Sequence, residues 1–159
     1  LTLGPEPLSR LLLFTYHAQA LLDGGPETPF MPESFPELEK PADVDGFLQV
    51  FRELEILTPQ WRRRLESPAP RAFLPQDRAL LRYLISRYWL QAISDFDLMG
   101  RVKFIVISCL LVGSLPGDFA ANAQLFSKEI ENDADNVDAI LDAAGTYRPF
   151  TDSRLLGSL

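Results

Sequence analysis

The sequence predicts an all-α fold, an irregular bundle of about six helices, on three observations. Apolar residues recur at the three- and four-residue spacing of helices along most of the chain. The thirteen prolines stand between these apolar stretches, where they separate helices instead of breaking them. No stretch keeps the two-residue alternation of a half-buried strand. With 159 residues, 47% of them hydrophobic, the chain can build the core of one domain over 1–159.

Residues 5–22 predict the first helix. Pro5 and Pro7 suit its first turn, and Gly24 and Gly25 end it. Its leucines and phenylalanine cover more than one face of the helix. We therefore expect an apolar face that contacts sequence outside this chain or a second copy of it, so a homo-oligomer is one expected assembly.

Residues 23–42 contain five prolines among acidic residues. Prolines prevent a continuous helix and remove the donors that a strand needs. The stretch therefore predicts a long, extended, acidic loop, with a disordered insertion as the alternative.

Residues 43–57 predict an amphipathic helix capped by Asp43 or Asp45. The pair Thr58–Pro59 then opens a short helix, because threonine suits the cap and proline the first position. The run Arg62–Arg64 on that helix is expected to be a solvated face rather than a phosphate site.

Two helices follow, one over about 75–93 and one from Ser94 or Asp95 to Leu115. Residues 104–115 are apolar on nearly all sides, which is typical of the central helix of a bundle. This run is too short to span a bilayer, which needs about 20 residues, so no membrane association is expected.

Asp118 is expected to cap the last main helix, which continues without a break to about residue 144. Apolar residues keep the helical period throughout this stretch, and Gly145 is the expected stop. The tail over 146–159 is expected to hold only a short turn.

The formal charge of −7 is unevenly distributed along the chain. Residues 61–103 carry a net charge of +5, between acidic ends that carry −7 and −5. Internal pairing is the favoured interpretation, and a basic surface for an acidic partner is the alternative. The overall charge argues against nucleic acid and anionic membranes as partners.

The single cysteine leaves no disulfide within the chain and no metal site built from cysteines. The chain starts at Leu1 without a methionine, which predicts a fragment or a processed product. It shows no signal peptide, so a cytoplasmic location is expected.

Aromatic and basic residues gather where the helices over 75–93 and 94–115 meet. Such a cluster can bind a planar or anionic ligand by stacking and charge. Its candidate residues are Tyr83, Arg87, Trp89 and Arg101. Arginine stems also pack along aromatic edges in ordinary helix contacts, and this structural role is the favoured interpretation.

A polar band on the last helix is the second candidate site. Its residues are Lys128, Glu129, Glu131, Asn132, Asp133, Asp135, Asn136 and Asp138, and of these Glu129, Asp133 and Asn136 share one face. Lys128, Glu129, Asn132 and Asn136 are its candidate site residues. Carboxylates at this spacing can ligate a hard cation, but one helix alone rarely encloses a metal, so a solvated face is favoured. The most specific expectation is a structural ion pair between Glu129 and Arg87 or Arg101.

Three motifs follow one another along this part of the chain. They are R-Y-x-x-x-R-Y-W at 82–89, R-V-K-F at 101–104, and F-S-K-E-I-E at 126–131 with Asn136 after it. In order and spacing they resemble the C-terminal helical half of the flagellin lysine-N-methylase family. The resemblance covers about residues 78–141, and the first helix resembles the family loosely.

The resemblance implies methyl transfer from S-adenosylmethionine to lysines of bacterial flagellin. It also implies an iron–sulfur or other metal cluster in a cysteine-rich N-terminal half, and no cofactor in this chain. That half lies upstream of Leu1 or is absent, and the family's usual histidine is Asn132 here. This chain would then be a non-catalytic half that supports the catalytic half or docks flagellin.

Two other functions stay open at this point. One is a non-enzymatic helical module that binds proteins, and the other is a small-ligand pocket where Tyr83, Arg87 and Trp89 meet. The sequence has no glycine-rich phosphate loop, no G-x-S-x-G and no H-E-x-x-H, so it assigns no catalytic residue.

Overall fold

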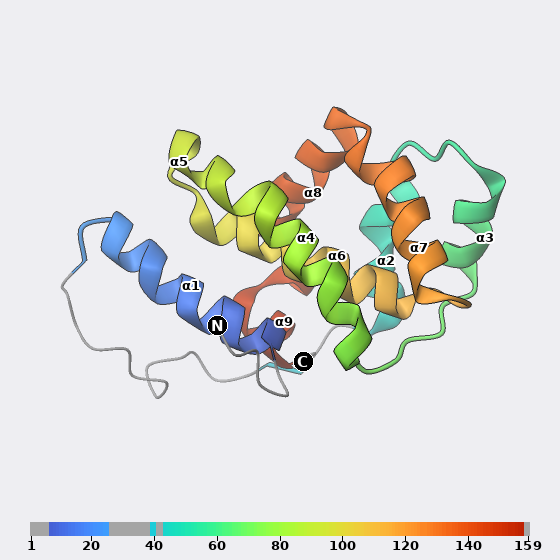
Figure 1. The fold of residues 1–159 in the computed structure, drawn as a ribbon, viewed down its shortest axis with the longest axis horizontal. Helices are drawn as coiled ribbons and strands as arrows, with labels where there is room; N and C mark the ends of the chain where they lie inside the picture. The colour runs from blue at the N-terminus through green and yellow to red at the C-terminus, as the bar shows by residue number, and fades with distance from the viewer. Residues whose placement is uncertain (1–6, 26–38, 41–42, 158–159) are drawn as a thin grey trace.

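The computed structural model describes residues 7–25, 39–40 and 43–157, and these residues form helices without any strand (Figure 1). The all-α prediction is therefore confirmed. The α-helices are α1 (Pro7–Leu22), α2 (Val44–Glu53), α3 (Pro59–Glu66), α4 (Arg78–Tyr88), α5 (Ala92–Asp95), α6 (Leu98–Ser114), α7 (Phe119–Phe126), α8 (Ala134–Thr146) and α9 (Asp152–Gly157). Short 3-10 turns are η2 (Pro75–Asp77), η3 (Trp89–Gln91) and η5 (Arg148–Phe150), and η4 (Ser127–Glu131) is a π-turn.

Helix α6 lies at the centre of the packing, as its apolar sequence predicts. It contacts α1, α4, α7 and α8, and Figure 1 shows it passing behind α4. The continuous stretch from Val102 to Cys109 is buried, Lys103 and Ser108 included. A helix that is apolar all round has to be covered on all sides, and the surrounding helices provide that cover.

Three predicted helix caps are confirmed. The side chain of Asp43 accepts from the Gly46 N–H at 2.6 Å and begins α2. The Thr58 hydroxyl accepts from the Trp61 N–H at 3.3 Å, and Asp118 caps α7. These residues satisfy N–H groups that the first turn of a helix leaves without an internal partner.

The predicted boundary between the helices of 75–93 and 94–115 is wrong. Helix α4 ends at Tyr88, and η3 and α5 lead to Phe96, whose backbone is left-handed with φ 59°. Helix α6 begins only at Leu98, with Asp97 as its cap, and Ser94 and Asp95 belong to α5.

The predicted unbroken helix over 118–144 is also wrong. Helix α7 passes into the π-turn η4, and the chain leaves the helix at Asn132. Asp133 then starts α8 by accepting from the N–H groups of Asp135 and Asn136, at 3.0 and 3.2 Å. Helix α8 also continues through Gly145, the predicted stop, and ends at Thr146. These divisions make the expected six helices only roughly right.

The predicted proline-rich loop over 23–42 lies largely outside the described residues. Within the described part, Glu39 pairs with Arg154 of α9 at 2.9 Å. None of the described helices is long and apolar enough to cross a membrane.

Candidate functional site

The π-turn η4 places two glutamates inside the protein, Glu129 and Glu131. A π-turn widens the backbone by one residue per turn and occurs often at functional sites. Both carboxylates are buried although they are only two positions apart. Each one has its own set of partners.

Glu131 is held by three side chains of α4. The Tyr83 hydroxyl donates to its two carboxylate oxygens at 3.1 and 3.3 Å, and the Tyr88 hydroxyl donates to Oε1 at 3.1 Å. Arg87 Nε lies 3.2 Å from the same Oε1. The Glu131 side chain is 1% exposed, while that of Arg87 is 46% exposed. The site is therefore a buried carboxylate with a partly solvated counter-ion.

The pKa values of both tyrosines are raised above their usual value of about 10. Burial raises the pKa of Tyr88 to about 12, and the nearby Glu131 carboxylate adds to the effect. Burial also raises the pKa of Tyr83, with the charge of Glu131 as the next cause. Both phenols are neutral at physiological pH and act as hydrogen-bond donors to Glu131.

A groove of 420 Å³ opens beside this carboxylate, between α4, α7 and η4. Alanine, leucine and phenylalanine side chains of α4 and α7 give it apolar walls, and Tyr83, Gln124, Ser127 and Glu131 give it polar ones. It is lined by Ala79, Leu80, Tyr83, Phe119, Ala120, Ala123, Gln124, Ser127 and Glu131. An apolar groove in which a few polar groups converge is the usual form of a small-molecule site.

Glu129 has a different role from the one predicted. It accepts a hydrogen bond from the Leu57 N–H at 2.8 Å and a second from the Thr58 hydroxyl. The predicted ion pair of Glu129 is wrong, because Arg87 pairs with Glu131 and Arg101 pairs with Asp95 at 2.5 Å. Glu129 thus fixes the connection between α2 and α3 to the π-turn.

Asn136 completes this connection. Its side-chain amide donates to the carbonyls of Glu55 and Glu129 at 3.0 and 2.9 Å, and its carbonyl accepts from the Glu55 N–H at 3.2 Å. Glu129 and Asn136 therefore form one buried polar unit, which we call the η4 joint. Its partners are backbone groups and a helix cap, which indicates a structural role.

The remaining predicted site residues lie away from the groove. Trp89 stacks on Phe14 of α1 with ring centroids 6.2 Å apart, and Arg101 is at the start of α6. Lys128 and Asn132 are exposed. The structure thus brings Tyr83 and Arg87 together and separates the other candidates from them.

Glu131 belongs to the predicted polar band, but the sequence analysis did not single it out as a site residue. Residues two positions apart on a helix point to different sides, so periodicity predicts that only one of Glu129 and Glu131 faces the interior. Both are buried because η4 is covered on two sides, by the α2–α3 connection at Glu129 and by α4 at Glu131. No periodicity in the sequence signals this double cover or the π-turn. The one available signal was its place in the K-E-I-E motif.

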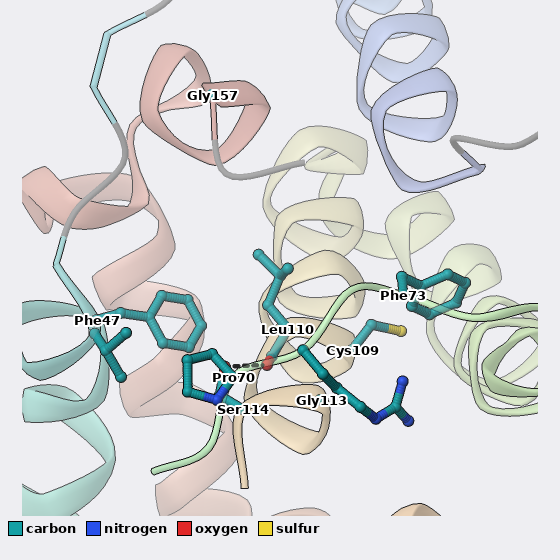
Figure 2. Close-up of a pocket in the computed structure, with 10 residues that line it drawn as sticks. Phe47, Pro70, Phe73, Cys109, Leu110, Gly113, Ser114 and Gly157 are labelled. Carbon is teal, nitrogen blue, oxygen red and sulfur yellow. Dashed lines mark hydrogen bonds between the residues drawn. The ribbon is translucent and has the colours of Figure 1, made fainter.

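A second cavity, of 260 Å³, lies against α6 on the side of α2 and α9 (Figure 2). Its lining residues are Val44, Phe47, Pro70, Arg71, Phe73, Cys109, Leu110, Gly113, Ser114 and Gly157. The segment that crosses α6 here is bound to it through the backbone, with the Ala69 N–H donating to the Ser114 carbonyl at 2.8 Å.

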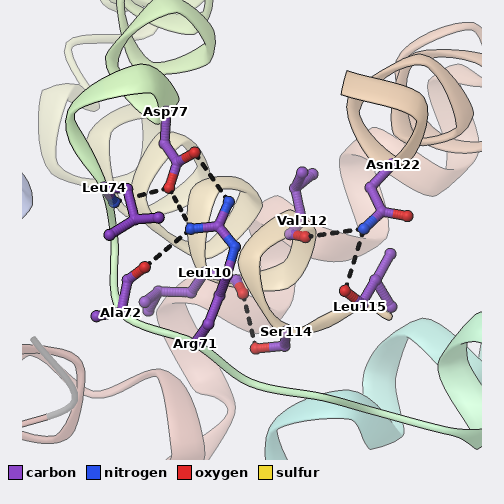
Figure 3. A network of polar contacts seen from close by, with 9 residues as sticks. All are labelled: Arg71, Ala72, Leu74, Asp77, Leu110, Val112, Ser114, Leu115 and Asn122. Carbon is purple, nitrogen blue, oxygen red and sulfur yellow. Dashed lines mark hydrogen bonds and ion pairs between the residues drawn. The ribbon is translucent and has the colours of Figure 1, made fainter. Parts of the chain in front are cut away.

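The guanidinium of Arg71, which lines this cavity, is hydrogen-bonded within the protein (Figure 3). Arg71 donates to both carboxylate oxygens of the fully buried Asp77, at 2.6 and 2.8 Å, and to the Ala72 carbonyl at 2.9 Å. Asp77 also accepts from the Leu74 N–H at 2.8 Å. This bidentate ion pair holds the 67–77 segment in place, so the network has a structural role.

Within the described residues, no three His, Cys, Asp or Glu side chains are grouped closely enough to hold a metal ion. The chain's cysteine, Cys109, is buried in α6, and burial raises the pKa of its thiol. The described side chains thus do not fit the ligand set of the cluster that the family resemblance implies. That cluster stays a prediction for sequence outside this chain.

No family model, curated protein or solved structure matches this chain. The resemblance to the methylase family therefore stays a prediction, and the function has to be inferred from the chemistry of the site.

Proposed function

We propose that this chain is a binding module whose groove between α4 and η4 takes an amphipathic ligand. The ligand has an apolar body and one uncharged hydrogen-bond donor. The observation that carries the proposal is a buried acceptor, Glu131, among the lining residues of an otherwise largely apolar groove. The groove volume of 420 Å³ falls within the usual range of about 300–1,000 Å³ for small-molecule sites.

Glu131 has acceptor capacity left for such a ligand. A carboxylate offers about four lone-pair sites. Tyr88 and Arg87 approach Oε1, while among the described residues Oε2 receives only the 3.3 Å contact from Tyr83. Oε2 is thus the oxygen with more acceptor capacity left for a ligand.

An uncharged donor suits this carboxylate better than a cation. Arg87 already provides its counter-charge at 3.2 Å. A ligand ammonium would add a second positive charge beside that guanidinium, whereas a hydroxyl or an amide adds a bond without repulsion. The apolar walls from Leu80 and Phe119 would cover the body of the ligand.

The test compares 1-octanol with its methyl ether, which has a similar body and no donor. Binding is followed by NMR through the methyl signals of Ala79 and Ala123. We expect the alcohol to bind about tenfold more tightly, since a hydrogen bond to a charged group contributes about 1.5–3 kcal/mol. Equal affinity for the two compounds, or no binding of either, would contradict the proposal.

Glu131→Gln is the diagnostic variant, and Asp138→Asn on the exposed face of α8 is its matched control. Glu131→Gln should reduce the preference for the alcohol, because a neutral amide oxygen is a weaker acceptor than a carboxylate. Asp138→Asn should leave the preference unchanged.

A second proposal keeps the family resemblance. What supports it is that Tyr83, Arg87 and Tyr88, from the first quoted motif, meet Glu131 from the third. The chain would then be the cytoplasmic, non-catalytic half of a lysine methylase, and the groove would receive part of flagellin. Bound metal in the full-length gene product, together with methylation of purified flagellin, would support it. A full-length gene product that binds no metal and does not methylate flagellin would refute it.

A further inference from the structure

One end of the molecule exposes a group of large apolar side chains, which we call the α1–α5 surface. It is formed by the outer face of α1 and by the segment of η3, α5 and the residue after it. Its residues are Phe14, Leu21, Leu22, Leu90, Ile93 and Phe96, each between 48% and 71% exposed. None of them takes part in the groove beside Glu131.

Contacts at both ends hold the two parts of this surface side by side. Phe14 stacks on Trp89, which directly precedes Leu90. The Gln19 side chain donates to the Phe96 carbonyl and accepts from the Met99 N–H, both at 3.0 Å. In Figure 1, α1 and α5 lie at the end of the molecule opposite α3. The six side chains thus belong to two adjoining elements rather than to scattered positions.

Phe96 is in an unfavourable backbone conformation at this surface. Its φ of 59° is left-handed, and its N–H donates to the Ala92 carbonyl at 2.8 Å to end α5. Glycine or asparagine is the usual residue at such a position, because a large side chain raises the energy of the left-handed backbone. The Phe96 ring is nevertheless 67% exposed. Within this chain, contacts of the ring therefore offset little of the energy cost of the left-handed backbone.

The exposed area lies at the upper end of the range for a monomer. Since a large apolar side chain carries up to about 200 Å² and about half of each is exposed, the six present roughly 600 Å². The largest apolar patch of an ordinary monomer is about 300–600 Å², while each partner in a stable complex buries about 800 Å². The α1–α5 surface would thus provide most of the area that a stable dimer buries, and the rest would have to come from residues around it.

We propose that the α1–α5 surface binds a second copy of this chain in a two-fold symmetric dimer. In such an interface the same patch serves both partners, so one apolar surface per chain is sufficient. Homodimer interfaces are also more apolar than other interfaces, which agrees with six uncharged side chains. The chain carries a net charge of −7, so salt should strengthen the association by screening repulsion between the copies.

The test is sedimentation of the wild-type chain and two variants over the micromolar range. Wild type is expected to be dimeric, with tighter association at higher salt. Ile93→Glu should raise the dissociation constant at least tenfold by placing a charge in the interface. Phe96→Gly should do the same by removing the ring, and glycine suits the left-handed backbone, so the fold of this variant is preserved.

Leu57→Glu is the matched control, since Leu57 is 54% exposed and lies just before α3, at the far end of the molecule. It should leave the dissociation constant unchanged. A wild-type chain that stays monomeric at high micromolar concentration would overturn the proposal. So would a dimer that neither Ile93→Glu nor Phe96→Gly weakens, or one that Leu57→Glu weakens as much.

Discussion

Glu129 and Glu131 stand on the same π-turn and are both buried, yet they meet opposite kinds of partners. Glu129 receives a backbone N–H and a hydroxyl from the connection between α2 and α3. Glu131 receives two phenols and a guanidinium from α4, and it borders an open groove. The first set belongs to a chain connection, whereas the second consists of side chains of one helix beside a groove. Burial alone therefore does not distinguish a structural carboxylate from a binding one.

The largest expected effect is that of Glu129→Ala. Removing this carboxylate leaves the Leu57 N–H and the Thr58 hydroxyl buried without their acceptor. We expect the free energy of unfolding to fall by about 3 kcal/mol. Thermal denaturation followed by circular dichroism should show a midpoint lower by about 10 °C, at about 2–4 °C per kcal/mol for a chain of this length. A shift no larger than that of Asp138→Ala would mean that the η4 joint is not structural.

The next largest effect is expected for Asn136→Ala, the other half of the η4 joint. The change removes three hydrogen bonds at a nearly buried position and should cost about 2 kcal/mol. Because both residues hold the connection between α2 and α3, the double variant with Glu129→Ala should cost less than the sum of the two single variants. Strict additivity in urea denaturation would show that the two residues act independently.

High pH should lower the free energy of unfolding through Tyr88, a hydrogen-bond partner of Glu131. The pKa of Tyr88 is raised in the folded protein to about 12, from about 10 in the unfolded chain. Its contribution to stability is fully present below pH 10 and is lost as the pH rises from 10 towards 12. We expect a loss of about 1 kcal/mol at pH 11, seen in urea denaturation at a series of pH values. Tyr88→Phe should remove this part of the pH dependence.

The smallest effect on stability is expected for Glu131→Gln. The amide still accepts from Tyr83 and Tyr88, and Arg87 is exposed enough to be solvated once its partner is neutral. We expect the free energy of unfolding to change by less than about 1 kcal/mol. The preference of the groove for a ligand with a donor should fall in the same variant. A thermal midpoint as low as that of Glu129→Ala would place both glutamates in the structural class.

Local features of the fold could be read from the sequence. Asp43, Thr58 and Asp118 were predicted as caps because a cap bonds to N–H groups only two or three residues away. The apolar run of α6 likewise predicted the central helix, because a helix of this composition has no face suited to water.

Features that depend on distant partners could not be read in this way. The hydroxyl that bonds to Glu129 comes from Thr58, 71 residues earlier in the chain. Arg87 and Tyr83 were identified as candidates, but their partner Glu131 lies on the π-turn η4, 48 residues after Tyr83. That turn and the break at Asn132 are hidden by apolar residues that keep a helical spacing on both sides. Periodicity reports which residues face inward, and it does not report where a helix is widened or interrupted.

The rate at which the buried thiol of Cys109 is chemically labelled can report how often the protein core opens. It is the one cysteine of the sequence, it is 1% exposed in α6, and burial raises its pKa. Cys109 borders the 260 Å³ cavity but is 1% exposed, so a thiol reagent should react with it much faster in molecules whose helices have separated from α6. The labelling rate therefore reports how often the core opens, without an engineered cysteine. Compared between Glu129→Ala and Glu131→Gln, this rate would show which side of the π-turn keeps the interior closed.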